Sequence, residues 1–323
     1  MYYRSDWPEV GLPTALSEKS LVGPTAHVDD DQAWVQETKV SGARFRWVAA
    51  PSNFESNLYR FPMWSLHVEV NDVDESILTT RLDSVTLREY ITEGIRQLLY
   101  VSPWGAAYVS SKLVKNEPLY DALLQAGFEE VEHRRLYMCK VRDITSEPLP
   151  SSAGNIQLTS LAAVASEQLS AYREQILDIC REAFEQKGYS RHFTDSVLLE
   201  RLPGIAYILA AMELNFKHVV PSHFLVAVDI GSDQICGFSA VGRKPGLGKH
   251  MYTQLLSAVR KAYHGQGIYR GLTHLLSQTL PQNALLLNVT HVGNHAIQRA
   301  YQNSGRVRLA DTVVLRRVFD ADR

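Results

Sequence analysis

The chain has 323 residues, of which 45% are apolar and 21% charged, and its formal net charge is −2. This length is enough for two domains of ordinary size, and the composition is typical of a soluble globular protein. A nearly neutral chain lacks the basic excess of most nucleic-acid-binding proteins, so we expect no nucleic-acid partner. The sequence has three cysteines, Cys139, Cys180 and Cys236, far apart and without a Cys-x-x-Cys motif. This odd, sparse count argues against a disulfide framework or a zinc knuckle and favours a reducing compartment.

The sequence carries no pattern of secretion or membrane insertion. Its first residues contain no apolar segment of the signal-peptide type. The most apolar helical stretch, Ile205 to Met212, is too short to cross a bilayer. We therefore expect a cytoplasmic protein with no membrane partner.

Residues 1–42 are predicted to form an irregular N-terminal arm, with one helix near Trp34. From Ala43 the pattern becomes strand-like, which predicts the start of a first domain over residues 43–145. The other elements expected in this domain are strands at Trp64–Val70, Ala106–Leu113 and Glu132–Val141, a helix at Thr86–Leu99, and a short helix from Asn116 that Gly127 stops.

Residues 146–155 are rich in proline, serine and glycine and are predicted to link the first domain to a second one, residues 156–323. The second domain is predicted to open with a strand and a long helix and to continue with a β-hairpin, at Ile156–Leu161, Ala165–Phe184, and Phe224–Asp229 with Ile235–Arg243.

A strand, a turn with two glycines and a helix are predicted next. Leu255–Val259 is a short apolar run of strand type, and Ile268–Leu280 carries apolar residues at helical spacing. Gly265 and Gly267 in the turn let the backbone approach an anion without side-chain obstruction. Free N–H groups at a helix start attract negative charge, so the turn is a candidate phosphate site. Taken alone, the two glycines are more typical of an ordinary strand-to-helix turn.

The end of the chain contains an internal repeat. A strand is predicted at Ala284–Val289, and Asn294 then opens a helix that ends at Gly305, eleven residues later. Asn116 and Gly127 have the same spacing, and strand-like sequence follows each glycine, which indicates two copies of one supersecondary unit.

The two copies differ at one position that bears on function. Four residues before its glycine the second copy has Tyr301, whereas the first copy has Leu123. The first domain also lacks a Gly-x-Gly turn. We therefore expect the first copy to be structural and the second to carry the chemistry.

The second copy resembles the acetyl-CoA-dependent N-acetyltransferases of the Gcn5-related (GNAT) family. Their strand-turn-helix motif, Val-x-Pro-x-Tyr-Arg-Gly-x-Gly-x-Gly/Ala, corresponds to Val259–Tyr269. Their later motif, Asn-x-x-Ala-x-x-x-Tyr-x-x-x-Gly-Phe, is matched by Asn294, Tyr301 and Gly305. His264 departs from the usual Arg or Gln, and Tyr269 departs from the usual Gly or Ala.

The resemblance implies an α/β (α+β) chain with two acetyltransferase-like domains. Each is expected to be a mixed, mostly antiparallel sheet flanked by helices, and the N-terminal one is degenerate. The implied reaction is transfer of an acetyl group from acetyl-CoA to a primary amine, with no metal ion.

Several residues take on roles that the resemblance implies. Tyr301 would be the general acid that protonates the departing thiolate, although a tyrosine on a helix also commonly packs in a core. The acetyl-CoA contacts would come from a bulged strand, the turn and the helix starts, at Ser257, Val259, His264, Gly265, Gln266, Gly267, Ile268, Tyr269 and Asn294.

Two of these assignments have alternatives. Asn294 is equally explained as a helix cap, and His264 as a solvated turn residue. The general base stays unassigned: His291, Glu182 and Glu185 are candidates by residue type alone, and a chain of water molecules would serve instead.

The acceptor is suggested by a finer resemblance. The run from Ser190 to Asp195 is similar to one in the dTDP-fucosamine N-acetyltransferases, which implies an amine on a nucleotide-linked sugar, with Arg191 on the substrate side. A surface arginine explains Arg191 equally well. Two other functions stay open, namely acyl-CoA transfer to another secondary-metabolite amine and a catalytically silent acetyltransferase-like binding module. A homodimer is also left open.

Overall fold

The structure is a computed structural model that describes residues 34–40, 43–71, 92, 107–115, 118–150, 154–185, 189–243 and 250–319. The chain divides into two compact units: unit 1 is residues 1–134 with 310–323, and unit 2 is residues 135–309. The helix expected at Thr86–Leu99 lies outside the described residues, except for Thr92. None of the described helices is long and apolar enough to span a membrane.

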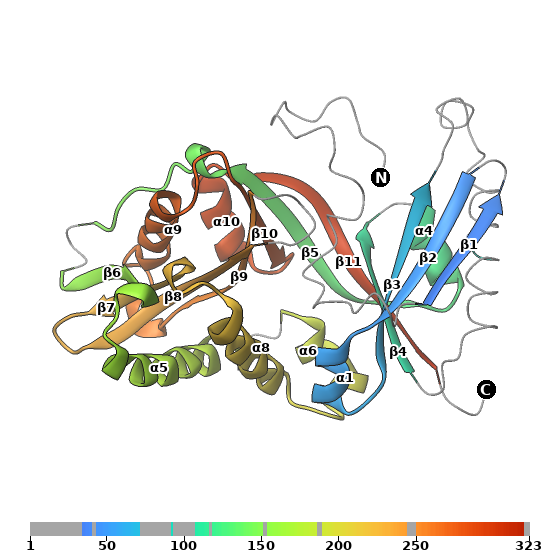
Figure 1. Cartoon of the computed structure of the whole chain (residues 1–323), viewed down its shortest axis with the longest axis horizontal. Coiled ribbons are helices and arrows are strands. Elements are labelled where there is room, and N and C mark those ends of the chain that lie inside the picture. The colour runs from blue at the N-terminus through green and yellow to red at the C-terminus, as the bar shows by residue number, and fades with distance from the viewer. Residues whose placement is uncertain are drawn as a thin grey trace. The chain divides into compact units, whose positions relative to one another are not determined.

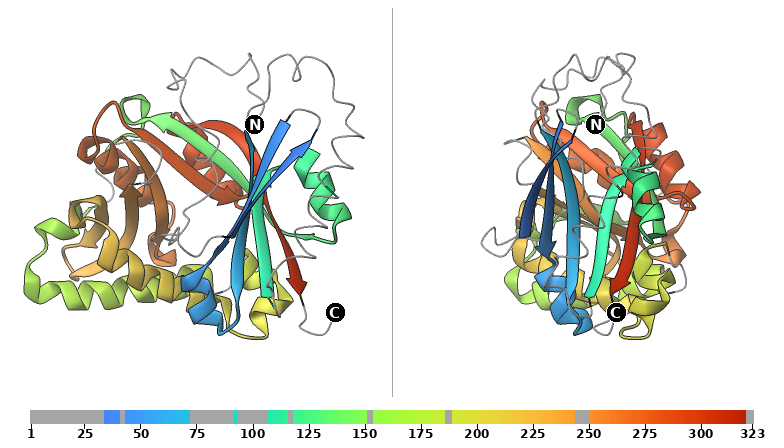
Figure 2. Two further views of the ribbon diagram at one scale, coloured as in Figure 1. Left: turned by 45° about the vertical axis from the view of Figure 1, so that its right-hand side comes forward. Right: turned by 90° about the vertical axis from the view of Figure 1, so that its right-hand side faces the viewer.

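Unit 1 is a group of adjacent strands with short helices (Figures 1 and 2). Its elements are β1 (Trp34–Val40), β2 (Ala43–Pro51), α1 (Asn53–Tyr59), β3 (Met63–Asn71), β4 (Ala107–Val114) and α4 (Pro118–Gln125). β1, β2 and β3 pair antiparallel in that order, β3 pairs parallel with β4, and β4 pairs antiparallel with β11 (Val307–Phe319). Its apolar core joins β3, β4, α4 and β11 through residues that include Leu66, Val109, Leu123 and Leu315.

Unit 2 carries the glycine turn. Its first elements are β6 (Ile156–Ser160), α5 (Ser166–Phe184), α6 (Arg191–Thr194), α7 (Ser196–Leu199), α8 (Gly204–His218), β7 (Phe224–Asp229) and β8 (Gln234–Arg243). Its later elements are β9 (Met251–Val259), the 3-10 helix η7 (Lys261–Tyr263), α9 (Ile268–Thr279), β10 (Leu285–His291) and α10 (His295–Asn303). These bounds confirm the strand, turn and helix order expected from the sequence.

Both faces of the unit 2 sheet are covered by helices. Phe224, Val226 and Val228 of β7 pack with buried side chains of α5 and α8. The alternate residues Leu225 and Ala227 pack with α9, since successive side chains of a strand point to opposite faces. Figure 1 shows α5 and α8 on one side of these strands and α9 on the other.

Three expectations are corrected by the structure. Trp34–Val40 forms a strand, β1, rather than a helix within an irregular arm, because pairing with β2 satisfies its backbone. The eleven strands found among the described residues follow one hydrogen-bonded order, β1-β2-β3-β4-β11-β5-β10-β9-β8-β7-β6, where two separate sheets were expected. The third correction concerns the domain boundary.

The boundary between the units falls within two strands and not at the predicted linker of residues 146–155. β5 (Glu129–Lys140) and β11 have 12 and 13 residues, which is longer than most strands, and each has residues in both units. The last residues of the chain therefore belong to unit 1. Within unit 2 the linker contacts α9: the carbonyl of Ser146 accepts from Nδ1 of His274 at 2.8 Å, and Glu147 pairs with Arg270 at 3.0 Å.

The internal repeat is confirmed in the backbone. Helix α4 ends at Gly127 and helix α10 at Gly305, with φ of 84° and 83°, a region that favours glycine. The amide of Phe128 donates to Leu123 and that of Arg306 to Tyr301, each carbonyl lying five residues earlier. With the amide bonds of the two glycines, this is a Schellman ending in both copies.

Candidate active site

Strands β9 and β10 separate after a short paired segment. They run parallel and pair only where Met251–Thr253 faces Leu285–Leu287. Both strands continue, to Val259 and to His291, and no further pairs join them although all these residues are described. The diverging segments Gln254–Val259 and Asn288–His291 are called the fork below. One edge of its β9 arm has no strand partner, so its backbone groups are available to an extended ligand.

A β-bulge in β9 accompanies this separation. Ala240 of β8 pairs with Leu256, and the next residue, Val241, pairs with Gln254. Leu255 is thus the extra residue of a bulge, which bends the strand and increases its twist. Ser257 and Val259 lie beyond the bulge on the β9 arm of the fork. The structure confirms the bulged strand that the sequence resemblance implied.

The turn after β9 opens α9 with free amides. Gly265 and Gly267 have φ of 81° and 78°, and Gly267 is the residue that precedes the helix. The first amide that bonds back to the turn is that of Gly271, to the carbonyl of Gly267 at 2.9 Å. The helix start therefore presents N–H groups without an intrahelical acceptor, the arrangement that binds anions.

Side-chain and backbone contacts from neighbouring elements hold this turn in place. The hydroxyl of Tyr263 donates to Asp229 at 2.9 Å, and the amide of Lys261 donates to Glu182 at 2.6 Å. Arg260 donates through Nε to the carbonyl of Ile235 at 2.9 Å. The bond to Asp229 raises the pKa of Tyr263 to about 12 and lowers the pKa of Asp229. The turn is thus anchored to α5 and to the β7–β8 hairpin.

His264 also helps to hold the turn in place. Its Nε2 lies 2.9 Å from the carbonyl oxygen of Val259. A carbonyl only accepts, so Nε2 carries a proton in this arrangement. The ring ties the turn to the end of β9, which leaves Nδ1 as the nitrogen able to meet another partner.

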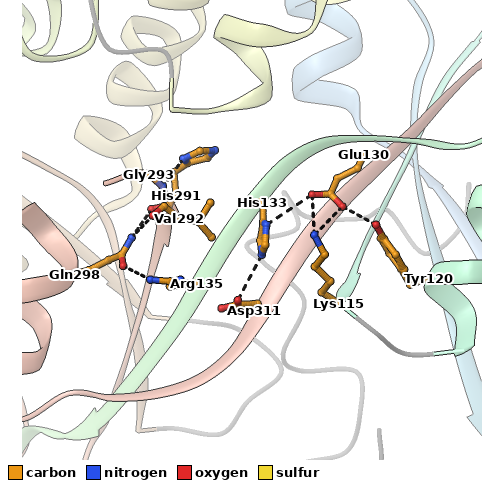
Figure 3. A network of polar contacts seen from close by, with 10 residues as sticks. All are labelled: Lys115, Tyr120, Glu130, His133, Arg135, His291, Val292, Gly293, Gln298 and Asp311. Atoms are coloured by element: carbon orange, nitrogen blue, oxygen red, sulfur yellow. Dashed lines mark hydrogen bonds and ion pairs between the residues drawn. The ribbon is translucent and has the colours of Figure 1, made fainter. Parts of the chain in front are cut away.

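Helix α10 is positioned by its first turns. Asn294 caps it, with its side-chain oxygen accepting from the amide of Ile297 at 3.4 Å. Gln298 binds the preceding turn through Nε2, which donates to the carbonyls of His291 and Val292 at 3.0 and 2.6 Å. Nη1 of Arg135, in β5, donates to Oε1 of Gln298 at 2.5 Å (Figure 3). Tyr301 follows Gln298 by three residues, so the same contacts set its position.

A chain of polar side chains lies at the inner end of the fork, where β9 and β10 begin to separate. We call it the fork cluster, and it consists of Ser239, Gln254, Tyr269, Asn288, Tyr301, Ser304 and Arg306. The Oε1 of Gln254 accepts from Nδ2 of Asn288 at 2.6 Å and from the hydroxyl of Tyr269 at 3.0 Å. The Nε2 of Gln254 donates to Ser239 at 2.9 Å. Arg306 donates to Oδ1 of Asn288 at 2.9 Å and also to the hydroxyl of Ser304.

Tyr301 lies among these residues with 4% of its surface exposed. Its ring meets that of Tyr137 edge-on at 5.3 Å, and the guanidinium of Arg306 lies 5.1 Å from its ring centroid. Burial raises the pKa of Tyr301 well above that of an ordinary phenol, and Tyr269 raises it further. Arg306 and the amide of Asn288 lower this pKa. At neutral pH the phenol keeps its proton, as an acid requires.

The remaining sequence candidates lie in different surroundings. Arg191, expected on the substrate side, is 2% exposed in α6. Glu182 accepts from the Lys261 amide, which makes it part of the turn's anchor. His291 accepts from the amide of Gly293 at 3.0 Å, and Glu185 is exposed at the end of α5. None of these contacts assigns a general base.

Five members of the fork cluster were not predicted from the sequence: Ser239, Gln254, Asn288, Ser304 and Arg306. Gln254 and Asn288 each carry a side-chain amide within a largely apolar strand, and a buried amide of this kind needs a polar partner. Arg306 occupies the position after Gly305, where the acetyltransferase motif has Phe. Of the departures from the two motifs, Tyr269 and Arg306 both approach Tyr301.

No protein-family model and no curated protein matches the sequence. Solved structures do match it. A GCN5-related N-acetyltransferase from Sphaerobacter thermophilus has a TM-score of 0.50 and 15% identity, over 86% of this chain and 82% of that one. A tandem GNAT protein from the clavulanic acid biosynthesis pathway has a TM-score of 0.49 and 10% identity, over 90% and 85%. A GCN5-related N-acetyltransferase from Kribbella flavida has a TM-score of 0.48 and 13% identity, over 87% and 89%. The described chain has an α/β fold similar to that of the GCN5-related N-acetyltransferase from Sphaerobacter thermophilus.

Proposed function

We propose that unit 2 transfers an acetyl group from acetyl-CoA to a primary amine. One observation carries the proposal: the fork between β9 and β10 opens beside a turn with free amides, and Tyr301 lies at its inner end. The likeness of fold is in agreement with this proposal, but fold alone supports many functions.

The residues present fit an acyl-CoA. The amides of Gly265, Gly267, Ile268 and Tyr269 at the start of α9 would hold the pyrophosphate, whereas the amide of Gln266 already donates to the carbonyl of Tyr263 at 3.4 Å. A Cβ added at Gly265 would meet no atom of the described residues within 4 Å, which leaves room for a ligand at this position. The unpaired edge of β9, from Gln254 to Val259, would bind the pantetheine arm by backbone hydrogen bonds. We assign His264 to shaping the turn, because its Nε2 already meets Val259.

When bound, the thioester supplies an acyl carbon activated toward a neutral amine. Tyr301 holds a proton at neutral pH, and we assign it to protonating the sulfur as the carbon–sulfur bond breaks. Asn294 caps α10, and through the cap it keeps Tyr301 in register with the fork.

For the acceptor we propose a primary amine, with nucleotide-linked amino sugars first in the screen. That order rests on the sequence resemblance around Ser190–Asp195. The burial of Arg191 speaks against a direct contact with the acceptor. Acceptance of other amines in preference to sugar amines would favour the alternative of a secondary-metabolite acyltransferase.

The test is turnover. Full-length protein is incubated with acetyl-CoA and a panel of primary amines, and amine-dependent release of thiol is followed together with the mass of the acetylated product. Tyr301→Phe is the matched control, because it removes only the phenolic oxygen. We expect release with at least one class of amine and its loss in the variant. Absence of release with every amine, from folded protein, would contradict the proposal and favour a binding module.

A further inference from the structure

Arg306 is a buried cation that no carboxylate neutralises. It is 3% exposed, and no ion pair joins it to any of the residues that the structure describes. Its Nη2 is buried and has no hydrogen-bond partner. Burying a charge is costly unless it is paired, so a residue of this kind calls for an explanation.

The turn itself does not require an arginine. In the first copy of the repeat the same position is Phe128, whose amide makes the same backbone bond at 3.0 Å, against 3.1 Å for Arg306. Phe128 packs with Leu123 in the apolar core of unit 1. An apolar residue thus meets every need of this helix ending, and the arginine serves another purpose.

The guanidinium sets the direction of the hydrogen bonds around Tyr301. An arginine can only donate, so Oδ1 of Asn288 must face it, and Nδ2 of Asn288 must face Gln254. Gln254 then accepts through Oε1 from the hydroxyl of Tyr269. The amide of Asn288 and the oxygen of Tyr269 are therefore presented to the phenol of Tyr301 in fixed roles. Changing Arg306 would release this whole chain of orientations.

The guanidinium also faces the ring of Tyr301 at 5.1 Å. In the proposed reaction the amine nitrogen bonds to the acyl carbon, and the sulfur leaves with the electron pair of the broken bond. The phenolic proton passes to the sulfur, which leaves a negative charge on the phenolate until the proton released by the nitrogen restores it. A buried cation beside the ring stabilises this charge, since Coulomb attraction is stronger away from water.

We propose that Arg306 is a positioning residue for Tyr301: it orients the amide of Asn288 and, through Gln254, the hydroxyl of Tyr269 toward the phenol, and it compensates the charge that the phenol acquires. The inference rests on the proposed acyl transfer. It goes beyond that proposal because Arg306, which stands where the acetyltransferase motif has Phe, takes part in proton transfer through Tyr301.

The first readout is independent of turnover. Tyr301 is replaced with 3,5-difluorotyrosine, whose phenol ionises at lower pH than that of tyrosine, and its ionisation is followed by fluorine NMR. Removing a nearby positive charge makes a phenol harder to ionise. We expect Arg306→Met to raise the midpoint by about 1–2 pH units and Arg306→Lys to raise it less. An unchanged midpoint in folded Arg306→Met protein would overturn the proposal.

The second readout is steady-state turnover with acetyl-CoA and the best amine of the screen. We expect Arg306→Met and Arg306→Phe to lower kcat by about 10- to 100-fold, with KM for acetyl-CoA nearly unchanged, and Arg306→Lys to recover part of the loss. The matched control is Arg317→Met in unit 1, which removes an arginine that donates to the carbonyl of Ala126 at the end of α4. It should melt at lower temperature with unchanged kcat.

The outcomes separate the two proposals. Turnover by the wild type with equal kcat in folded Arg306→Met protein would refute the role of Arg306 and leave acyl transfer standing. If Arg306→Met shifts the ionisation midpoint but the wild type shows no turnover, the proposed function is refuted. The effect of Arg306 on the ionisation of Tyr301 would then have no part in catalysis. Thermal melting of each variant shows that the comparison is made on folded protein.

Discussion

The two copies of the repeat share one backbone conformation at the helix ending and differ in the side chains that it brings together. In unit 1, α4 ends at Gly127 and continues into β5; in unit 2, α10 ends at Gly305 and continues into β11. In both, the residue after the glycine bonds back to the residue five positions earlier. The pair that this bond joins is Leu123 with Phe128 in the first copy.

In the second copy the pair is Tyr301 with Arg306. Leu123 is 0% exposed within an apolar core, whereas Tyr301 lies within the fork cluster. The helix ending is therefore set by the glycine and the backbone, and the chemistry by the two side chains that the ending brings together. The comparison shows how a shared turn can serve packing in one copy and a polar site in the other.

The largest effect is expected from Tyr301→Phe. It leaves the ring and its contact with Tyr137 but removes the phenolic proton. We expect kcat to fall by about 10²- to 10⁴-fold with little change in KM for acetyl-CoA, as measured by thiol release. Unchanged turnover would remove Tyr301 from the role of acid.

Leu123→Ala tests the opposite copy. The side chain is fully buried in the core of unit 1, so its truncation leaves a cavity. We expect a loss of about 2–5 kcal/mol in the free energy of unfolding, measured by urea denaturation, and unchanged kcat per folded molecule. Lower kcat in protein of unaltered stability would show that the first copy takes part in the chemistry.

The paired substitutions Gly305→Ala and Gly127→Ala distinguish the packing around the two helix endings. Both positions have positive φ, which costs an alanine about 1–2 kcal/mol. A Cβ at Gly305 would also lie 2.5 Å from the carbonyl oxygen of Asp143, whereas at Gly127 it meets the side chain of Arg317 at 3.5 Å. We expect Gly305→Ala to be the more destabilising by about 1–3 kcal/mol in the same denaturation assay. Equal losses would contradict this difference in packing.

The smallest expected effect is on alkaline stability. The pKa of Tyr301 is raised in the folded protein, so above the pKa of an unfolded tyrosine, about 10, the unfolded chain releases a proton that the folded chain keeps. Below that pH the contribution to stability is complete, and above it stability falls as pH rises. We expect Tyr301→Phe to reduce the slope by up to about 1.4 kcal/mol per pH unit.

Other tyrosines with raised pKa values contribute to the same slope. Hydrogen bonding and burial raise the pKa values of Tyr120, Tyr172 and Tyr263 to about 12, so the wild-type slope is a sum. Denaturation curves of wild type and Tyr301→Phe, measured side by side above pH 10, isolate the difference. Identical slopes would mean that Tyr301 does not differ between the folded and unfolded states.

The features predictable from the sequence were local. The order from β9 to α10 follows from apolar periodicity and glycine positions, and Asn294 and Gly305 mark helix ends by their own chemistry. The pairing of β1 was missed because Trp34–Val40 has no strong alternation and depends on its neighbour β2. The unit boundary was missed because β5 and β11 have residues in both units, which no composition shift marks.

The site was predictable only in part, because the fork cluster is assembled from residues far apart in the chain. Gln254 and Asn288 come from β9 and β10, Arg306 directly precedes β11, and no spacing rule links the three. The roles of Ser257, Val259 and the turn amides toward acetyl-CoA stay predictions.

The most direct test of the account is calorimetric titration of the full-length protein with acetyl-CoA. The account predicts binding at micromolar strength and one molecule per chain, because only the second copy has the glycine turn. Two molecules per chain would contradict the division of roles between the copies. Absence of binding, with longer acyl-CoAs equally without heat, would contradict the proposed function itself.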